Sequence, residues 1–469
     1  MPADGPTPPA SAEPPPLPKS GLRGWLTMGI YQPLFLLAFL IYGPVLLWRL
    51  WFGKGGQRTS MRERMGFVSP RAAADRPLVW IHGVSVGEVK AASNFVAELR
   101  RARPDLDLVI STTTPNGRLV AHQEYPDLPV VTYPLDLANF PGRALTRLQP
   151  RCVLLMELEI WPNFLQAARR REIPVAVING RISERTFKGY RRARGLLPQL
   201  DLISRYCVQD VAYEKRLLDL GVDARRVCVT GNMKYDSVQM GNHREAAVEL
   251  RPWLSPNGER VLVSGSTHDD EESQVLQAIA EIHERSSPSN SELAVRIVLV
   301  PRHPERSPQV CEAVQQAGLR AVRWSEVYGG ASSPGPLAPG DVVVVDTIGQ
   351  LQRFYTACDV AFVGGSLIPH GGQNMLEPAA LGRAVLFGPH TDNFRRDVEL
   401  LLTAEAVVQV ANAEQFRVEL ERLLRDDDRC RAFGERARRV IEQNQGATLR
   451  TLDLVQDLLG PAVRGAAAG

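Results

Sequence analysis

Carboxylates stand where two apolar runs in the first half of the chain end. One run leads to Ser85 and Glu88, and another leads to Glu157 and Glu159. A carboxylate at the end of a buried strand can act as a general base, and a pair suits acid–base chemistry or a metal. Glu157 and Glu159 would project to the same side of an extended chain. The spacing of Ser85 and Glu88 equally fits a capping box, which satisfies free backbone donors at a helix start.

A glycine-rich segment in the second half has the composition of an anion cradle followed by sugar contacts. The run Val360–Val363 ends in Gly364 and Gly365, where backbone N–H groups can close on an oxyanion because no side chain intervenes. Asn374 and Glu377 follow, one helical turn apart on one face, in a position to contact sugar hydroxyls. A tight strand-to-helix turn without a ligand is the alternative, but the whole segment favours nucleotide binding.

Basic side chains follow other apolar runs. Arg302 and His303 come after the run 297–300, and Lys234 comes after the run 227–230. Arginine binds phosphate through two N–H groups and lysine adds a mobile charge, so these residues indicate an anionic ligand. No Asp-x-Asp triplet follows a run and the histidines lack metal-ligand spacing, so we expect no metal.

The elements that must position these groups are short apolar runs that alternate with amphipathic stretches from Leu78 onward. Continuous apolar strands followed by polar loops indicate parallel sheets covered by helices on both faces. We therefore expect an α/β protein with two doubly wound Rossmann-like domains, whose strand ends face a cleft. The predicted domains are 60–238 and 259–469, joined by a linker at 239–258 that contains two prolines. The last helix could pack back on the first domain.

The N-terminus has two features of its own. Residues 1–20 are rich in proline and predict a disordered tail. Residues 21–52 predict a membrane-anchor helix, because Trp25–Trp48 carries no charge and is long enough to cross a bilayer. A larger basic cluster follows this helix than precedes it, which places the body of the protein on the cytoplasmic side. An interfacial helix and a buried core helix are the alternatives.

The composition excludes several classes of protein. The net charge of +3 is too small to indicate a nucleic-acid partner. The six cysteines form no Cys-x-x-Cys pair, which fits reduced thiols in a core and excludes a disulfide frame or zinc site.

Together these segments resemble the 3-deoxy-D-manno-octulosonic acid (Kdo) transferases of lipopolysaccharide assembly. The matching segments are HGVSVGE, STTTPNG, MELEIWPN, INGRIS, GNMKYD, GSTHDDEE, LVPRHPER, the stretch Gly364–Pro378 and GPHTDNF. The resemblance implies a glycosyltransferase-B fold and transfer of Kdo from CMP-Kdo onto a lipid A precursor, lipid IVA. It also implies an inverting mechanism without metal or cofactor, at the cytoplasmic face of the inner membrane.

By the same resemblance, Glu88 is the base that deprotonates the acceptor hydroxyl, and Glu157 is a second essential carboxylate. The implied donor-binding residues are Lys234, Ser266, Arg302, His303, Gly364, Gly365, Gly372, Gln373, Asn374, Met375 and Glu377, and the acceptor-side residues are Ser85, Gly87, Thr113 and Arg181. The chain departs from the family where Gln373 replaces a common histidine and where Asp270 replaces a frequent glycine. Asp270 would then adopt a backbone conformation that glycine makes easy.

Two other functions fit the same residues. One is a glycosyltransferase-B enzyme that uses a UDP- or GDP-sugar and a lipid acceptor. The other is a membrane-tethered nucleotide-binding protein without catalytic activity.

Overall fold

The computed structural model describes residues 61–71, 76–194, 198–238, 244–285, 293–328 and 337–461, with scattered helical residues between 29 and 44. The predicted tail, 1–20, and most of the predicted anchor, 21–52, lie outside the described residues. Within the described part of the chain, no helix combines the length and the apolar character needed to cross a membrane.

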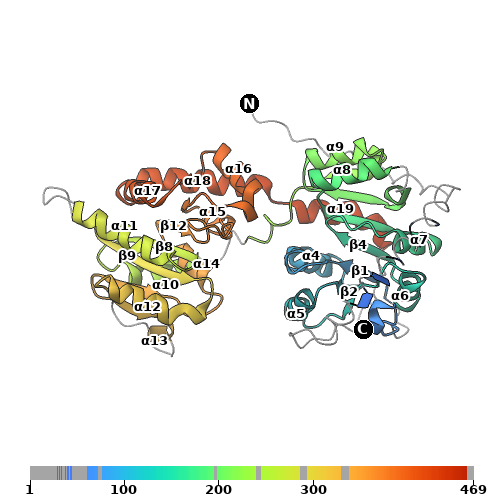
Figure 1. Ribbon diagram of the computed structural model, residues 1–469, viewed down its shortest axis with the longest axis horizontal. Helices are drawn as coiled ribbons and strands as arrows, with labels where there is room; N and C mark the ends of the chain where they lie inside the picture. The colour runs from blue at the N-terminus through green and yellow to red at the C-terminus, as the bar shows by residue number, and fades with distance from the viewer. Residues whose placement is uncertain are drawn as a thin grey trace, which may run out of the picture. The chain divides into compact units, whose positions relative to one another are not determined.

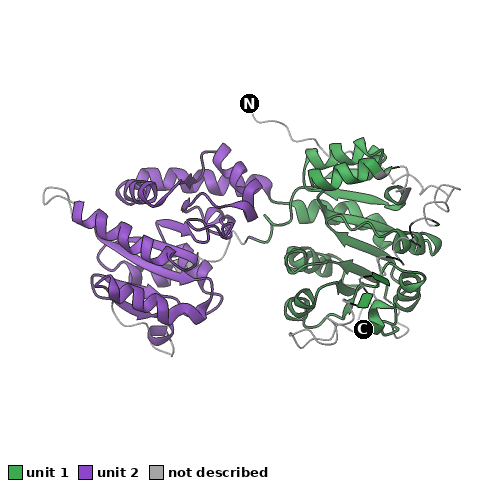
Figure 2. Ribbon diagram, viewed as in Figure 1, with its two compact units in different colours: residues 1–237, 445–469 green, residues 238–444 purple. Residues whose placement is uncertain are grey.

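The chain forms two compact units (Figure 2). Unit 1 contains residues 1–237 and 445–469, and unit 2 contains residues 238–444. The predicted second domain, 259–469, therefore ends earlier, and its last helix belongs to unit 1, which is the alternative that the sequence left open. Figure 1 shows the reason: the last helix, α19 (Ala447–Leu459), lies among the elements of unit 1.

The predicted linker, 239–258, also needs correction. It contains the helix α10 (Arg244–Leu254), with Pro252 inside it. Leu250 and Leu254 of this helix are buried in a core of unit 2. Burying each leucine stabilises the unit by about 1.5–3 kcal/mol. Most of the predicted linker is therefore a packed helix of unit 2.

The sheet of unit 1 has seven parallel strands in the order β3-β2-β1-β4-β5-β6-β7. The strands are β1 (Leu78–His82), β2 (Asp107–Thr112), β3 (Val130–Thr132), β4 (Cys152–Met156), β5 (Val175–Gly180), β6 (Arg205–Val208) and β7 (Val227–Val229). The order reverses between β1 and β4, which are direct neighbours with His82 opposite Leu155. This reversal makes the topological switch point of a doubly wound sheet.

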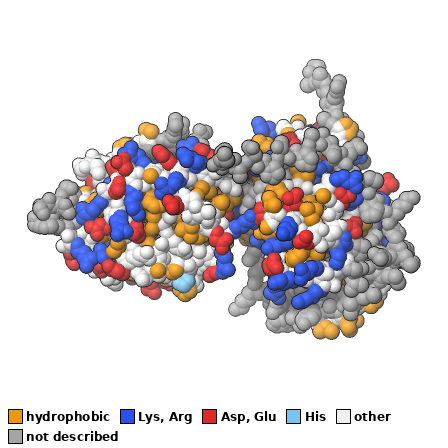
Figure 3. All heavy atoms as spheres, turned by 90° about the horizontal axis from the view of Figure 1, so that it is seen from above, with side chains coloured by type: hydrophobic (Ala, Val, Ile, Leu, Met, Phe, Trp, Pro, Cys, Tyr) orange, Lys and Arg blue, Asp and Glu red, His pale blue; other side chains and the backbone are white. Residues whose placement is uncertain are grey.

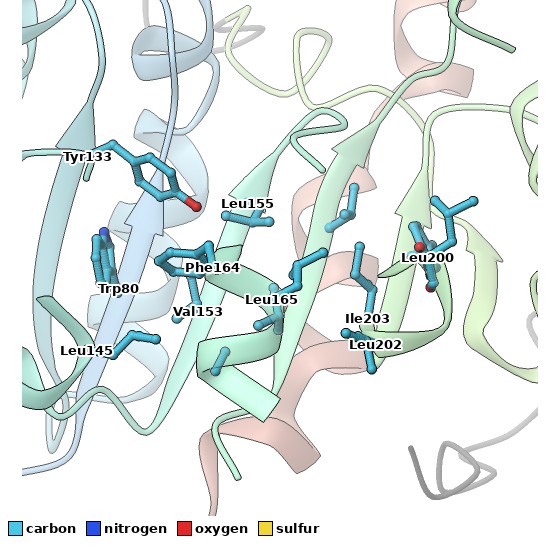
Figure 4. Close-up of a cluster of buried hydrophobic side chains, with 14 of the residues drawn as sticks. Trp80, Tyr133, Leu145, Val153, Leu155, Phe164, Leu165, Leu200, Leu202 and Ile203 are labelled. Atoms are coloured by element: carbon cyan, nitrogen blue, oxygen red, sulfur yellow. Dashed lines mark hydrogen bonds between the residues drawn. The ribbon is translucent and has the colours of Figure 1, made fainter. Parts of the chain in front are cut away.

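Helices cover both faces of this sheet. The helices of unit 1 are α2 (Met61–Arg64), α3 (Val86–Ala91), α4 (Ser93–Ala102), α5 (Pro115–Glu124), α6 (Phe140–Leu148), α7 (Pro162–Arg170), α8 (Glu184–Ala193), α9 (Val211–Asp219) and α19. One core joins the sheet to α6, α7, α8 and α9, and it includes the aromatic group of Trp80, Tyr133 and Phe164 (Figure 4). The other core joins the sheet to α3, α4, α5 and α19.

Unit 2 repeats the plan with the strand order β10-β11-β9-β8-β12-β13-β14, again all parallel. Its strands are β8 (Arg260–Thr267), β9 (Val295–Pro301), β10 (Arg320–Arg323), β11 (Asp341–Val344), β12 (Val360–Val363), β13 (Ala384–Phe387) and β14 (Val408–Gln409). The switch point lies between β8 and β12, which pair directly.

Helices also sandwich the sheet of unit 2. They are α10, α11 (Glu271–Arg285), α12 (Ser307–Gln316), α13 (Trp324–Tyr328), α14 (Leu351–Ala357), α15 (Leu376–Ala380), α16 (Arg395–Thr403), α17 (Ala413–Arg425) and α18 (Asp427–Asn444). Side chains of α11, α12 and α17 fill one core, and side chains of α10, α13 and α14 fill the other. The predicted α/β class with two doubly wound parallel sheets is confirmed, whereas the predicted cleft between the domains stays a prediction.

Basic and acidic side chains are interspersed over the face of the molecule drawn in Figure 3. Neither unit shows a field of one sign on this face, in keeping with the small net charge of +3.

Candidate functional site

The predicted carboxylates of unit 1 lie at its switch point. Glu88 belongs to α3, directly after β1, and Glu157 follows β4, the neighbour of β1. Ligands of doubly wound sheets bind outside the carboxyl ends of the strands at this point, because the connecting helices diverge to opposite faces. The fold therefore brings together two residues that are far apart in the sequence.

Glu88 is half-buried and its carboxylate is held in place by two donors. The backbone N–H of Val84 donates to Oε2 and the Ser85 hydroxyl donates to Oε1, each at 2.8 Å. The Ser85 hydroxyl also accepts from the Glu88 N–H, so the predicted capping arrangement is present. Each carboxylate oxygen has two lone pairs, and one contact on each leaves room for a further donor. The cap therefore orients Glu88 without excluding a role as base.

Glu157 differs from the expectation in its backbone. Its φ of 57° places it in the left-handed region, so Glu157 and Glu159 are not two residues of one extended strand. The prediction that they project to one side for that reason is wrong. Instead, Arg181 donates from Nε to Glu157 Oε2 at 2.6 Å. Burial raises the pKa of Glu157, Arg181 opposes the rise, and the neighbouring Glu88 adds to it.

Glu159 completes a group of three interacting carboxylates. Its Oε2 accepts the indole N–H of Trp161 at 2.8 Å. The pKa of Glu159 is raised to about 7, chiefly by burial and further by the charges of Glu88 and Glu157, although the Trp161 contact opposes the rise. Like charges in one site oppose ionisation, so Glu159 is partly protonated near neutral pH. The resemblance did not assign Glu159 a role, although its position after β4 was visible in the sequence.

Of the predicted acceptor-side residues, Ser85 and Arg181 contact these carboxylates directly. Gly87 is exposed, and an added Cβ would meet only the Ser85 hydroxyl, at 3.8 Å, so a ligand has space to approach. Thr113 follows β2 and its carbonyl accepts a hydrogen bond from Arg64 at 2.6 Å.

Lys234, a predicted donor-binding residue, follows β7, and its backbone N–H donates to the Asn232 side chain at 3.0 Å. Lys234 thus belongs to unit 1, unlike the other predicted donor-binding residues.

His82 is a packing residue. It is fully buried within β1, its Nδ1 contacts the Ser111 hydroxyl at 2.9 Å, and its ring stacks on Tyr133. Burial lowers its pKa to about 3, so the ring stays neutral.

The predicted anion cradle in unit 2 exists, but its occupant is part of the protein. The backbone N–H groups of Gly365, Ser366 and Leu367 donate to the carboxylate of Glu271 at 2.7, 3.0 and 3.0 Å. The interpretation of this turn as an empty phosphate cradle is therefore wrong. Gly364 is required for steric reasons, because an added Cβ would lie 2.6 Å from the Ser266 carbonyl oxygen.

The segment after this turn is tied together by its own side chains. Asn374 donates to Glu377 Oε1 at 2.9 Å, so the two predicted sugar-binding residues contact each other. The Gly372 N–H donates to the Gly365 carbonyl at 2.7 Å. Met375 is fully buried, so the structure shows no exposed part of this residue that a donor could contact.

Arg302 and His303 follow β9 at the same edge of the sheet. Both are exposed, and the Arg302 N–H donates to the Thr267 carbonyl at 2.9 Å. Ser266 lies beside them where β8 is irregular, with a φ of 55°. The ring of His268 lies 3.9 Å from that of His370 and 6.1 Å from that of His303. Burial and these neighbouring cations lower the pKa of His268 to about 4.

Comparisons with known proteins identify the family of this chain. The family described as 3-Deoxy-D-manno-octulosonic-acid transferase (kdotransferase) matches residues 59–237. A 3-deoxy-D-manno-octulosonic acid transferase of Bordetella pertussis is 34% identical over 430 residues, covering 88% of this chain and 95% of that protein. The chain belongs to the Kdo transferase family. A Kdo transferase of Haemophilus influenzae is 31% identical and covers 86% of this chain and 92% of that protein.

This Kdo transferase is thus a glycosyltransferase, and its fold has distant relatives. The UDP-GlcNAc 2-epimerase of Neisseria meningitidis, solved bound to UDP-GlcNAc, covers 81% of this chain and is covered entirely. At 14% identity and a TM-score of 0.53, this likeness shows the fold alone.

The two departures of this Kdo transferase from the family pattern have distinct explanations. Asp270 has a φ of 70°, so it adopts the left-handed backbone that glycine takes easily, as predicted. Gln373 places its amide nitrogen 3.1 Å from His268 Nε2, and its backbone N–H donates to the Gly364 carbonyl. The amide therefore bonds to a neutral ring where the family's histidine would add another cation.

Proposed function

We propose that this Kdo transferase moves Kdo from CMP-Kdo onto a lipid A precursor, lipid IVA, with inversion at the anomeric carbon. The observation that carries the proposal is the position of Glu88, held by two donors at the switch point of unit 1. Membership of the Kdo transferase family is the basis for the proposed sugar. The resemblance of the motifs is the basis for the proposed nucleotide and acceptor.

In the proposed reaction Glu88 takes the proton of an acceptor hydroxyl. The freed oxygen attacks the anomeric carbon of Kdo, and the bond from that carbon to the phosphate oxygen of CMP breaks. CMP leaves with the electron pair of that bond. Gly87 leaves space for the acceptor, and Ser85 with the Val84 N–H orients the base.

Cations and neighbouring carboxylates complete the scheme. Arg302 and Lys234 are the proposed partners of the phosphate and carboxylate of the donor, where fixed charges stabilise the leaving group. The charge of Glu88 raises the pKa of both Glu157 and Glu159, so the three carboxyl groups interact electrostatically beside the proposed base. We propose that no metal takes part, so transfer should continue in the presence of a chelator.

The proposal also gives the enzyme a location. An acceptor held in the bilayer would be reached most easily by an enzyme fixed to the same surface, because tethering raises the effective concentration. We place the protein at the inner membrane, anchored through residues 21–52, with the catalytic units on the cytoplasmic side.

The test of the proposed base is Glu88→Gln. It keeps the shape of the side chain but removes the proton acceptor, so transfer should fall by about 10²–10⁴-fold while CMP binding is retained. Purified enzyme is incubated with CMP-Kdo and lipid IVA, and the products are weighed by mass spectrometry. Glu98→Gln is the matched control, since Glu98 lies on α4 and pairs only with Arg101 among the contacts described.

Each other outcome removes a different part of the proposal. Transfer that survives Glu88→Gln would exclude Glu88 as the base. Tighter binding of UDP than of CMP by calorimetry would exclude CMP-Kdo as donor and favour another sugar nucleotide. Nucleotide binding without any product would favour a protein that has lost catalysis.

A further inference from the structure

Glu271 is the most completely hydrogen-bonded buried carboxylate at the switch point of unit 2. Its side chain has no solvent exposure, and it is the first residue of α11. Oε2 accepts from the N–H groups of Gly365 at 2.7 Å and His268 at 3.0 Å. Oε1 accepts from the N–H groups of Ser366 and Leu367, both at 3.0 Å.

These contacts explain how a bare carboxylate is tolerated in the interior. A buried charge is costly unless hydrogen bonds replace its hydration. Burial raises the pKa of Glu271, and the four N–H contacts act in the opposite direction. Successive N–H groups in a turn form an anion-binding concavity, and here the anion is Glu271.

The turn 364–367, which Glu271 holds, accepts hydrogen bonds from the segments that follow it. The Gly365 carbonyl accepts from Gly372, and the Gly364 carbonyl accepts from Gln373. The Ser366 carbonyl accepts from His390, and its hydroxyl accepts from the Gly388 N–H at 2.9 Å. The two family segments that follow β12, the stretch Gly364–Pro378 and GPHTDNF, are therefore both hydrogen-bonded to residues 364–367.

Glu271 is itself held in place by the packing of its helix, α11. Val275, Leu276 and Ile279 of α11 are buried in the main core of unit 2. Glu271 thus links helix α11, which is anchored in that core, to the turn 364–367.

We propose that Glu271 is a positioning residue, whose carboxylate fills the anion site of the turn 364–367 and fixes the segment that binds the nucleotide. The inference rests on the proposed function, because it assigns that segment to CMP. It has two consequences. The phosphate of the donor must bind elsewhere, at side-chain cations such as Arg302, and loss of the Glu271 contacts must weaken nucleotide binding.

The first experiment needs no variant. Amide hydrogen exchange of the unchanged protein is measured across residues 364–367, without and with CMP. Slow exchange in both states is expected, since the amides are already bonded. Fast exchange that CMP slows would overturn the inference, because the phosphate would then be bound by the turn itself.

The second experiment uses Glu271→Gln, with Glu259→Gln as the matched control. A glutamine can accept from one pair of N–H groups only, and its NH₂ would face the other pair. We expect exchange at 364–367 to rise at least about tenfold, and the Kd for CMP to rise about as much. Glu259 is also a buried carboxylate, paired with Arg296, but it lies at the amino end of β8. Its variant should lower the stability of unit 2 without changing the Kd for CMP.

The outcomes separate this inference from the proposed function. If the unchanged protein binds CMP and Glu271→Gln binds it within twofold, only the positioning role is wrong. If the unchanged protein binds no CMP, the proposed donor is wrong, and the exchange measurement alone decides whether Glu271 holds the turn. If Glu271→Gln does not fold, the experiment on the unchanged protein still decides.

Discussion

At the scale of single residues, the titration of Glu159 depends on burial and on the neighbouring carboxylates Glu88 and Glu157. Glu159, whose pKa is raised to about 7 from a usual 4.5, binds its proton more tightly in the folded than in the unfolded chain. Its contribution to stability is therefore complete below pH 4.5 and is lost as the pH rises through 7. We predict that Glu159→Gln, which stays neutral, is more stable than the unchanged protein at pH 8 and that the difference shrinks towards pH 5. Thermal unfolding at a series of pH values measures this difference.

Trp161→Phe provides the companion variant for that series. It removes the N–H that lowers the pKa of Glu159, so the loss of stability should move to higher pH. Equal loss of stability between pH 5 and pH 8 in the unchanged protein and in Glu159→Gln would contradict the prediction.

At the scale of elements, α19 shows how a helix at the end of the chain completes the first unit. Leu452, Val455 and Leu459 are buried against the sheet of unit 1, and Asp236 accepts hydrogen bonds from the Gly446 and Thr448 N–H groups. Burying such side chains contributes about 1.5–3 kcal/mol each, a large part of the stability of a domain. We predict that deleting residues 445–469 unfolds unit 1 and leaves unit 2 folded, as read by hydrogen exchange across the chain.

The matched control for this deletion ends the chain at Pro461, which keeps the whole of α19. It should preserve the amide protection of β1 and β4. Unchanged amide protection of these strands after the longer deletion would show that unit 1 does not need α19 to fold.

At the scale of the whole molecule, the N-terminal segment is expected to serve attachment and not the cores. Among its described residues, Tyr31 donates from its hydroxyl to Asp136 in the rest of unit 1 at 3.0 Å. We predict that a chain lacking residues 1–50 keeps both units folded but cosediments less with phospholipid vesicles. Loss of the folded units would show that the segment belongs to a core, and undiminished cosedimentation would show that attachment lies elsewhere.

The pattern of the strands was largely predictable from the sequence. Runs such as LVWIHG and VAFVGG coincide with β1 and β12, because a buried parallel strand must be apolar on both faces. Two edge strands were missed. β10 reads Arg-Ala-Val-Arg with no residue fully buried, and β14 has two residues, so neither produces a continuous apolar run. These two strands lack the signal because one is partly exposed and the other is very short.

The sequence by itself determined the class of fold, the family and the residues that end most of the strands, because these depend on local patterns. Only the tertiary structure decided which groups meet. It placed Glu88, Glu157 and Glu159 in one electrostatic group, assigned α19 to unit 1, and filled the glycine turn with Glu271. These outcomes depend on contacts between residues far apart in the chain, which the spacing of residues along the sequence does not encode.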